Sequence, residues 1–421
     1  MQTIIVFLLV FSIIVVIHEW GHFYFAKKAG ILVREFALGM GPKLFSKEGK
    51  DGVVYTVRML PLGGYVRLAG LGEDEDAVKA GMTVGLRFNQ EGEIDRIDTS
   101  ESSDMDLMPV LVHALDLTKE MVMHVVPVGQ TEQVTYSVNR KARIIEPDGT
   151  SILVAPEEVT YNAATPWNKA RMNVAGPLNN FMLSVVVFMI VGLFSPGIPN
   201  EQSIIGEVVA GDAAATAGLQ ANDHVVAIDG NSVTTWTDMA TIIGQSADKT
   251  LTFTVERNQE TLQIAIPVKS VQDEQTKQTV GRIGIVKSMK TALTDRLLYG
   301  FTQTWQVIVA VLMALVSMVK SGFNLNSFGG PLAMAQATGQ AVQYGWLSTL
   351  AFMGMISANL GVFNLLPIPA LDGGKIILNG IEALRGKPLS QEKEGIITLI
   401  GASLLILLML AVTWNDISRL F

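Results

Sequence analysis

The chain alternates between long apolar runs and polar stretches. Charge-free runs over 174–194, 346–366 and 396–414 are each long enough to cross the bilayer, since about 20 helical residues cover its hydrocarbon core. A fourth run, 3–17, leads directly into the polar sequence HEWGH at 18–22. The pattern predicts a polytopic α-helical membrane protein with about four transmembrane helices, over 3–26, 174–194, 346–374 and 396–414.

Two segments allow another interpretation. The first run resembles a signal peptide in its apolar character, but it has no basic residues before it and no small-residue cleavage site before His18. We therefore expect it to remain as a helix. Residues 297–319 are also free of charge, and hydropathy alone would make them a fifth crossing.

Composition agrees with a membrane protein. Of 421 residues, 49% are hydrophobic and 17% are charged, which is less charge than soluble chains of this length carry. The net charge of −8 gives no support to nucleic-acid binding. The chain has no cysteine, which excludes disulfides and thiolate metal ligands.

Basic residues beside the apolar runs predict the orientation, because Lys and Arg near the ends of a span are retained on the cytoplasmic side. They follow the first span, precede the second and lie between the third and fourth: Lys27, Lys28, Arg34, Lys169, Arg171, Lys375, Arg385, Lys387 and Lys393. We therefore expect a multi-pass protein of the plasma membrane with both termini outside the cell.

Three polar regions carry strand signals. Residues 53–70 hold two strand-like runs around a Pro-Leu-Gly-Gly turn, which predicts a β-hairpin. The region 71–165 starts with an acidic run at 73–76 and continues with alternating stretches, which predicts a cytoplasmic β-rich insert. Outside the cell, 203–271 combines short apolar strands, a helix-compatible AAATAGL and an Asp-Gly turn, which predicts a small α/β module.

The polar group in the first span has the spacing of a metal site. His18 and His22 are four residues apart and share a helix face, so both imidazoles can bind one ion with Glu19 beside them. Chance HExxH sequences occur in soluble helices, but ionisable residues inside a membrane helix are costly and usually functional. In such sites zinc acidifies a bound water and the carboxylate takes its proton. The pattern predicts a hydrolytic zinc site.

A hydrolytic zinc ion usually has three protein ligands, so a third is expected. The other three histidines fall in the soluble regions. Asp372, in NLLPIPALDGG over 364–374, is the carboxylate at matching depth, although it could also be an ordinary turn residue before two glycines. Pro367 and Pro369 predict a helix break just before it.

These motifs together resemble the site-2 proteases, which are intramembrane zinc metalloproteases, and within them the bacterial RseP/RasP type of the Gram-positive branch. The resemblance rests on HEWGH, on AGPLNNF over 175–181 and on NLLPIPALDGG, and it covers nearly the whole chain. It implies zinc ligation by His18, His22 and Asp372. It also implies that Glu19 is the catalytic base.

The resemblance further implies a substrate-binding region. Asn364 is expected to contact the substrate backbone, and the family's G-x-x-x-N pattern falls on Gly176 and Asn180. The expected substrate-binding residues are thus Asn364, Pro367, Pro369, Gly176 and Asn180. The 53–70 hairpin is expected to re-enter the membrane and offer a strand edge to an unwound substrate. A cytosolic surface hairpin is the alternative.

The family resemblance implies cleavage within single-pass membrane proteins, such as anti-sigma factors and signal-peptide remnants, after an upstream site-1-type protease has trimmed them. Residues 203–271 resemble a PDZ domain, which could exclude bulky substrates or capture a newly exposed chain end. Two other function classes compete. A metal-dependent transporter or sensor has no use for Glu19 as a base, and an inert scaffold would only recruit partners through the PDZ-like module.

The two halves of the metal site restrict the topology. His18 is about 17 residues into the chain and, at about 1.5 Å per residue, lies beyond the bilayer centre toward the cytoplasm. Asp372 can reach it only if the third span ends on that side, which requires an even number of crossings between them. Spans two and three supply two crossings. Residues 297–340 are therefore expected to form membrane-associated helices that do not span.

Overall fold

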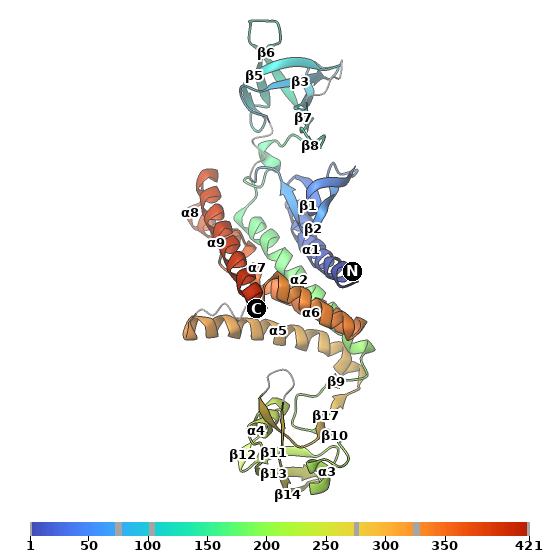
Figure 1. The fold of residues 1–421 in the computed structure, drawn as a ribbon. Helices are drawn as coiled ribbons and strands as arrows, with labels where there is room; N and C mark the ends of the chain where they lie inside the picture. The colour runs from blue at the N-terminus through green and yellow to red at the C-terminus, as the bar shows by residue number, and fades with distance from the viewer. Residues whose placement is uncertain (1, 72–77, 101–105, 273–277, 323–328, 419–421) are drawn as a thin grey trace. The chain divides into compact units, whose positions relative to one another are not determined.

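The computed structural model describes residues 2–71, 78–100, 106–272, 278–322 and 329–418 (Figure 1). They form two compact units. One consists of Met1–Val187 and Gln303–Phe421, and the other is Phe188–Thr302.

The helices of the described residues coincide with the apolar runs. Those long and apolar enough to cross a membrane are α1 (Gln2–Lys28), α2 (Pro166–Phe194), α5 (Leu293–Ser321), α7 (Trp346–Asn364) and α9 (Gln391–Ser418). The shorter helices of the first unit are α6 (Pro331–Gln343) and α8 (Asp372–Arg385). Helices are therefore confirmed at all four predicted spans and within 297–340, of which 323–328 lie outside the described residues.

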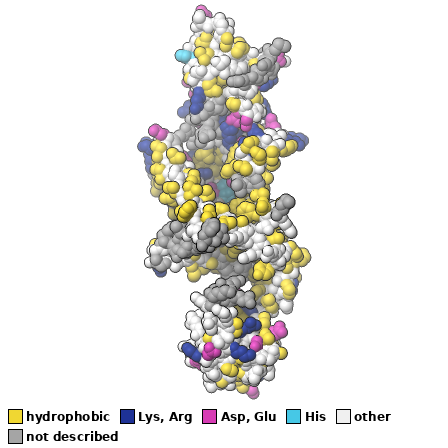
Figure 2. All heavy atoms as spheres, in the orientation of Figure 1, with side chains coloured by type: hydrophobic (Ala, Val, Ile, Leu, Met, Phe, Trp, Pro, Cys, Tyr) yellow, Lys and Arg dark blue, Asp and Glu magenta, His cyan; other side chains and the backbone are white. Residues whose placement is uncertain are grey.

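Three of these helices share one apolar core. Val10 and Ile14 of α1 pack with Val187 of α2 and Met353 of α7. By contrast, much of the outer surface of α9 and α1 consists of exposed apolar side chains, such as Leu399 at 66% and Ile4 at 63% exposure. Figure 2 shows hydrophobic side chains over α9 and over the first strands. Such surface is typical of segments that face lipid.

The first two strands, β1 (Val33–Glu48) and β2 (Val54–Leu68), form one bent antiparallel pair. Phe36 of β1 pairs with Tyr55 on one side and with Val66 on the other. The start of β1 therefore lies between the two halves of β2, and the second half of β2 forms an edge.

The prediction that 53–70 is a self-contained hairpin is wrong, because its two halves flank β1 and not each other. The sequence pattern did not predict β1, because the alternation of apolar and polar residues along this strand is interrupted at residues 39–42. There Gly39 and Gly41 adopt φ of 88° and 83°, a region that favours glycine, and bend the strand. A Cβ at Gly39 would lie 2.6 Å from the Leu60 carbonyl oxygen, so the chain also approaches closely there.

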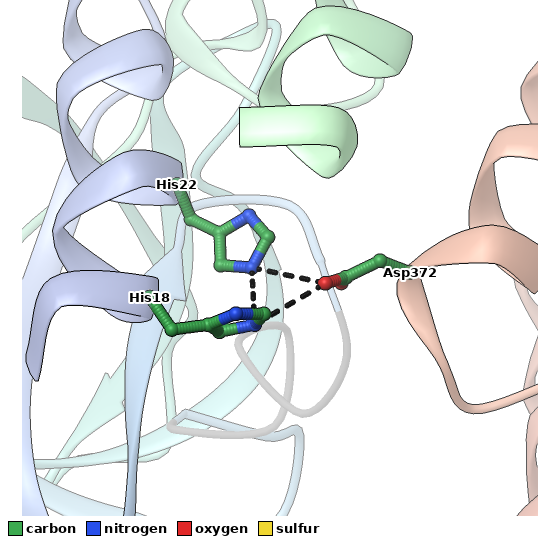
Figure 3. Close-up of side chains that lie close together, drawn as sticks. All are labelled: His18, His22 and Asp372. Carbon is green, nitrogen blue, oxygen red and sulfur yellow. Dashed lines mark hydrogen bonds and ion pairs between the residues drawn. The ribbon is translucent and has the colours of Figure 1, made fainter. Parts of the chain in front are cut away.

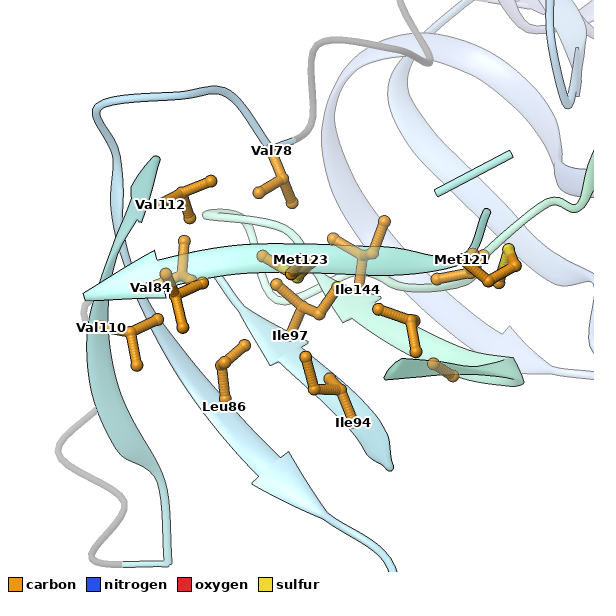
Figure 4. Close-up of a cluster of buried hydrophobic side chains, with 14 of the residues drawn as sticks. Val78, Val84, Leu86, Ile94, Ile97, Val110, Val112, Met121, Met123 and Ile144 are labelled. Atoms are coloured by element: carbon orange, nitrogen blue, oxygen red, sulfur yellow. The ribbon is translucent and has the colours of Figure 1, made fainter. Parts of the chain in front are cut away.

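The predicted β-rich insert over 71–165 is confirmed as a six-stranded sheet in the order β4-β3-β5-β6-β7-β8. Strand β4 also pairs with β7, which closes the sheet into a small barrel. Its strands are β3 (Thr83–Phe88), β4 (Ile94–Asp98), β5 (Met108–Asp116), β6 (Val122–Pro127), β7 (Val134–Ile145) and β8 (Ser151–Leu153). Leu86, Ile94, Ile97 and Met123 fill its core (Figure 4). The acidic run at 73–76 lies outside the described residues.

Ion pairs join the insert to both edges of the β1–β2 pair. The ion pairs are Arg67–Glu146, Lys43–Asp148 and Arg143–Glu48. Burial alone would raise the pKa of Asp148, but hydrogen bonds from Lys43 and Thr150 lower this pKa to about 2. Asp148 therefore stays ionised at physiological pH, and its pairing would be lost only as the pH falls from about 4 toward 2.

The second unit is an α/β module with its own core. Its four-stranded sheet has the order β12-β11-β13-β14, and Ile205, Val225, Phe253, Ile266 and Ile283 are buried inside. The elements are β9 (Ile198–Pro199), β10 (Ile205–Val208), α3 (Ala213–Ala217), β11 (His224–Ile228), β12 (Asn231–Ser232), α4 (Trp236–Gly244), β13 (Thr250–Arg257), β14 (Glu260–Pro267), β15 (Lys269–Gln272), β16 (Thr279–Arg282), β17 (Ile285–Lys287) and β18 (Met289–Lys290).

The predicted module boundary at 271 is too early. Strand β17 pairs with β10, and Ile283 belongs to the core, so the module continues to about residue 290. Asn200 N–H donates to the Ser288 carbonyl oxygen at 2.9 Å, which brings its two ends together.

We predict that Arg67→Glu releases the β7–β8 turn from the edge of β2. Arg67 and Glu146 are 23% and 15% exposed, so two like charges there should cost about 1 kcal/mol and raise amide exchange in residues 146–153 about fivefold. The double variant Arg67→Glu/Glu146→Arg should restore protection.

The matched control is Arg140→Glu. Its pair with Glu158 is 58% exposed on both sides and should contribute little. Equal exchange in Arg67→Glu and the unchanged chain would show that this pair does not hold the insert.

Candidate metal centre

Three ligand atoms from opposite ends of the chain converge at one point (Figure 3). His18 Nε2 and His22 Nε2 are 3.1 Å apart, and each lies 3.3 Å from Asp372 Oδ2. Ligand atoms about 2.05 Å from a tetrahedral zinc ion are separated by about 3.3 Å. The three side chains therefore fit a zinc ion with one position left open.

Helix α2 sets the orientation of both imidazoles. His22 Nδ1 lies 2.8 Å from the Met172 carbonyl oxygen, which can only accept, so the ring donates from Nδ1 and leaves Nε2 free for the metal. The side-chain amide of Asn180 lies 3.0 Å from His18 Nδ1.

The Asn180 amide provides a second test of the fit. In the orientation recorded, Nδ2 faces His18, and the buried Oδ1 has no hydrogen-bond partner among the described residues. A metal-bound His18 carries its proton on Nδ1. Turning the amide by 180° lets Oδ1 accept that proton, so metal ligation by His18 gives the unpaired oxygen a partner.

Glycines allow α1 and α2 to approach closely enough for these contacts. A Cβ at Gly21 would lie 2.6 Å from the Ala175 carbonyl oxygen, and one at Gly176 would lie 2.4 Å from His22 Nε2. Any larger residue at Gly176 would occupy the space of the metal ligand itself.

Asp372 reaches the histidines because α7 ends early. The helix stops at Asn364, before Pro367 and Pro369, and α8 starts at Asp372, so the predicted break is confirmed while a span reaching 374 is not. Ala370 adopts φ of 78°, an unusual conformation for a residue with a side chain.

A cavity of about 300 Å³ adjoins the metal ligands. Glu19 lines it, one residue after His18, as do Asn364 and Lys375. Tyr65 of β2 lines it as well and donates a hydrogen bond to Glu35 at 3.0 Å. Burial, followed by the charge of Glu35, raises the pKa of Tyr65 to about 12, so its hydroxyl stays protonated.

The structure separates the expected substrate-binding residues into two groups. Asn364 lines the cavity, and its expected contact with the substrate backbone stays a prediction. Gly176 and Asn180 do not line it: both are buried beside the histidines, and their assignment to substrate binding stays a prediction. Pro367 and Pro369 also lie outside the lining, in the break between α7 and α8.

The sequence did not predict several of the residues that line the cavity, namely Tyr65, Asn173, Ala370 and Lys375. Lys375 follows Asp372 by one helical turn, which would have been a usable signal had α8 been expected. Tyr65 and Asn173 carried no such signal, because their proximity depends on how β2 and α2 pack.

The chain is similar to known peptidases. The model of peptidase family M50 matches residues 6–408. The candidate protease Eep of Enterococcus faecalis is 44% identical over 424 residues, covering 100% of both chains. A zinc metalloprotease candidate of Streptococcus pyogenes serotype M18 is 44% identical over 427 residues, and one of Lactococcus lactis is 42% identical over 433. They cover 100% of this chain and 100% and 99% of those relatives.

A solved PDZ domain from the SdrC-like protein of Listeria monocytogenes is also similar, at 20% identity over 21% of this chain and 90% of that one, with a TM-score of 0.18. The family match extends over nearly the whole chain, and it includes the apolar helices as well as both halves of the metal centre. The chain therefore belongs to peptidase family M50 and is a multi-pass membrane metalloprotease.

Proposed function

We propose that this metalloprotease hydrolyses peptide bonds inside the transmembrane segments of other membrane proteins. Zinc is held by His18, His22 and Asp372, and Glu19 is the catalytic base. The observation that carries the proposal is the location of the histidines in α1, a helix whose exposed side chains include Ile4, at 63%, and Leu9, at 55%. A substrate reaching this site through lipid is itself membrane-embedded.

Glu19 is placed to move the proton of the attacking water. It lines the cavity beside the ligands, so it can accept this proton and pass it to the leaving amine. Zinc, when bound, supplies Lewis acidity toward water and the scissile carbonyl. In the same cavity the Asn364 amide can donate hydrogen bonds to the substrate backbone, and the Tyr65 hydroxyl, whose proton is donated to Glu35, can accept one from it.

The edge of β2 supports a way to hold an unwound substrate. Its second half pairs with β1 on one side, and Gly64, Val66 and Leu68 line the cavity. A strand edge offers unpaired backbone groups that an extended peptide can join. The exposed apolar residues Leu44 and Leu60 further suit this pair of strands to re-entry into lipid.

We also propose four crossings, with both termini outside and the metal site toward the cytoplasm. The convergence of His18, His22 and Asp372 supports it. An odd number of crossings between the end of α1 and Asp372 would place Asp372 on the opposite side of the membrane from the histidines. Helix α5 suits a position at the membrane surface, since Asp295, Thr302 and Gln306 share one of its faces.

The substrates we propose are single-pass membrane proteins, of the anti-sigma factor or signal-peptide-remnant kind, already trimmed by a site-1-type protease. The α/β module between α2 and α5 would act as a size filter, because the chain links it directly to α2 and it folds around its own core. Its likeness to PDZ domains makes end capture the competing role.

We predict that Asp372→Ala lowers zinc content well below one ion per chain and abolishes cleavage, because one of three ligands is lost. Glu19→Gln should keep the zinc and lower the cleavage rate by about 10²- to 10⁴-fold. The measurements are metal analysis of the purified chain and cleavage of a reporter helix.

The two variants separate the function classes. An inert scaffold or a metal transporter would lose nothing in Glu19→Gln. Full zinc occupancy in Asp372→Ala would remove Asp372 from the site.

We predict that single cysteines at Thr291 and Tyr344 both react with a membrane-impermeant thiol reagent added outside. Both positions are exposed, and the chain has no other cysteine. A cysteine at Lys387, between α8 and α9, should react only after permeabilisation. Labelling of Thr291 without Tyr344 would mean that α5 crosses the membrane.

We predict that replacing 201–287 by a short Gly-Ser linker lets the enzyme cut a reporter helix that still carries a bulky outer domain. The hydrogen bond between Asn200 and Ser288 makes such a linker compatible with the remaining fold. The full enzyme should cut only the trimmed reporter. End capture predicts instead that the linker variant fails on the trimmed reporter, and equal cutting of both reporters by the full enzyme excludes a filter.

A further inference from the structure

A buried ion pair joins α2 to α8 away from the metal. Lys169 Nζ lies 2.8 and 2.9 Å from the two carboxylate oxygens of Glu382. The Lys169 side chain is 1% exposed and that of Glu382 is 12% exposed. A buried charge is costly unless its partner remains in place, so the position of either side chain constrains the other.

Two further contacts extend this pair into a cluster. Lys169 Nζ lies 5.0 Å from the centre of the Tyr161 ring, within the range of a cation–π interaction. The Tyr161 hydroxyl donates to Asn379 Oδ1 at 3.4 Å. Tyr161 and Asn379 are 3% and 5% exposed. The cluster thus holds α8 at two positions one turn apart.

The same helix carries the third metal ligand. Asp372 is the first residue of α8, and Asn379 and Glu382 follow it by seven and ten residues on the same side of the helix. Ten residues correspond to about 15 Å along the axis. The chain before α8 is not helical, so the orientation of Asp372 depends on what α8 packs against.

Helix α2 is the common reference for both halves of the metal site. Through Met172 and Asn180 it orients His22 and His18, and through Lys169 it holds α8. A rotation of α8 by about 20° would move a carboxylate roughly 5 Å from its axis by about 2 Å. Metal ligands tolerate about 0.2 Å.

We propose that Lys169 and Glu382 are positioning residues for the metal centre, which hold Asp372 at bonding distance from the zinc defined by His18 and His22. The inference rests on the proposed role of Asp372 as a ligand. It assigns no contact with substrate or metal to either residue.

The test measures zinc affinity of the full-length chain by competition with a chromophoric chelator, and the visible absorption of the cobalt(II)-substituted protein. Lys169→Met and Glu382→Gln should each weaken zinc binding about 10- to 100-fold and alter the cobalt spectrum. The double variant should bind zinc about as weakly as the weaker single variant, because the two residues act as one unit.

Arg67→Met is the matched control, because it breaks a partly buried ion pair that involves neither α8 nor α2. It should leave zinc affinity within about twofold of the unchanged chain. Unchanged zinc affinity and cobalt spectrum in both single variants, or an equal loss in Arg67→Met, would overturn the proposal.

Two additional variants keep the outcome unambiguous. Asp372→Asn, measured in parallel, should lose zinc affinity, and if it does not, the assignment of Asp372 as a ligand fails. If Asp372→Asn loses zinc affinity while Glu382→Gln keeps it, only the positioning role is refuted. If the single variants do not accumulate as folded protein, Glu382→Asp keeps the charge and shortens the side chain. It should weaken zinc binding at least threefold, and an unchanged affinity would again overturn the proposal.

Discussion

The convergence of two histidines and one aspartate is the constraint on which the first unit depends. His18 and His22 come from the first helix, while Asp372 starts the eighth. No local sequence preference can bring such distant residues within 3.3 Å of one another. The packing of the helices between them must therefore bring these residues together. Helix α2 contributes through its polar contacts with His18, His22 and Glu382.

Polar contacts of this kind are unusual in apolar helices, and their burial explains why they hold. Asn180 and Ser357 are both 0% exposed, and Ser357 Oγ donates to the Asn180 carbonyl oxygen at 2.8 Å, which joins α7 to α2. In an apolar environment such groups have few alternative partners. Close packing at Gly361, where a Cβ would lie 2.6 Å from the Phe181 ring, adds a steric limit. The site is thus built on rigid helix contacts.

The chemistry of this protein could be predicted from sequence far better than the packing around it. HEWGH and the aspartate after Pro367 and Pro369 predict one candidate ligand set, because residue type and spacing decide ligation, and the structure brings these three side chains together. The hydrogen-bond partners of those residues could not be predicted. The sequence does not show that Asn180 of α2 packs against His18, because this contact depends on how the two helices pack. Nor could the order of strands around β1, because a turn signal in β2 does not say which strand lies between its halves.

The order in which the ligands are made has a consequence for biosynthesis. Helix α1 with both histidines leaves the ribosome first, whereas Asp372 follows only after most of the chain has been made. Until then the two histidines lack their carboxylate partner, and the cavity lacks the walls contributed by Asn364 and Lys375. The three residues can therefore act together only after α8 has been made, so the chain's own synthesis delays the onset of proteolysis.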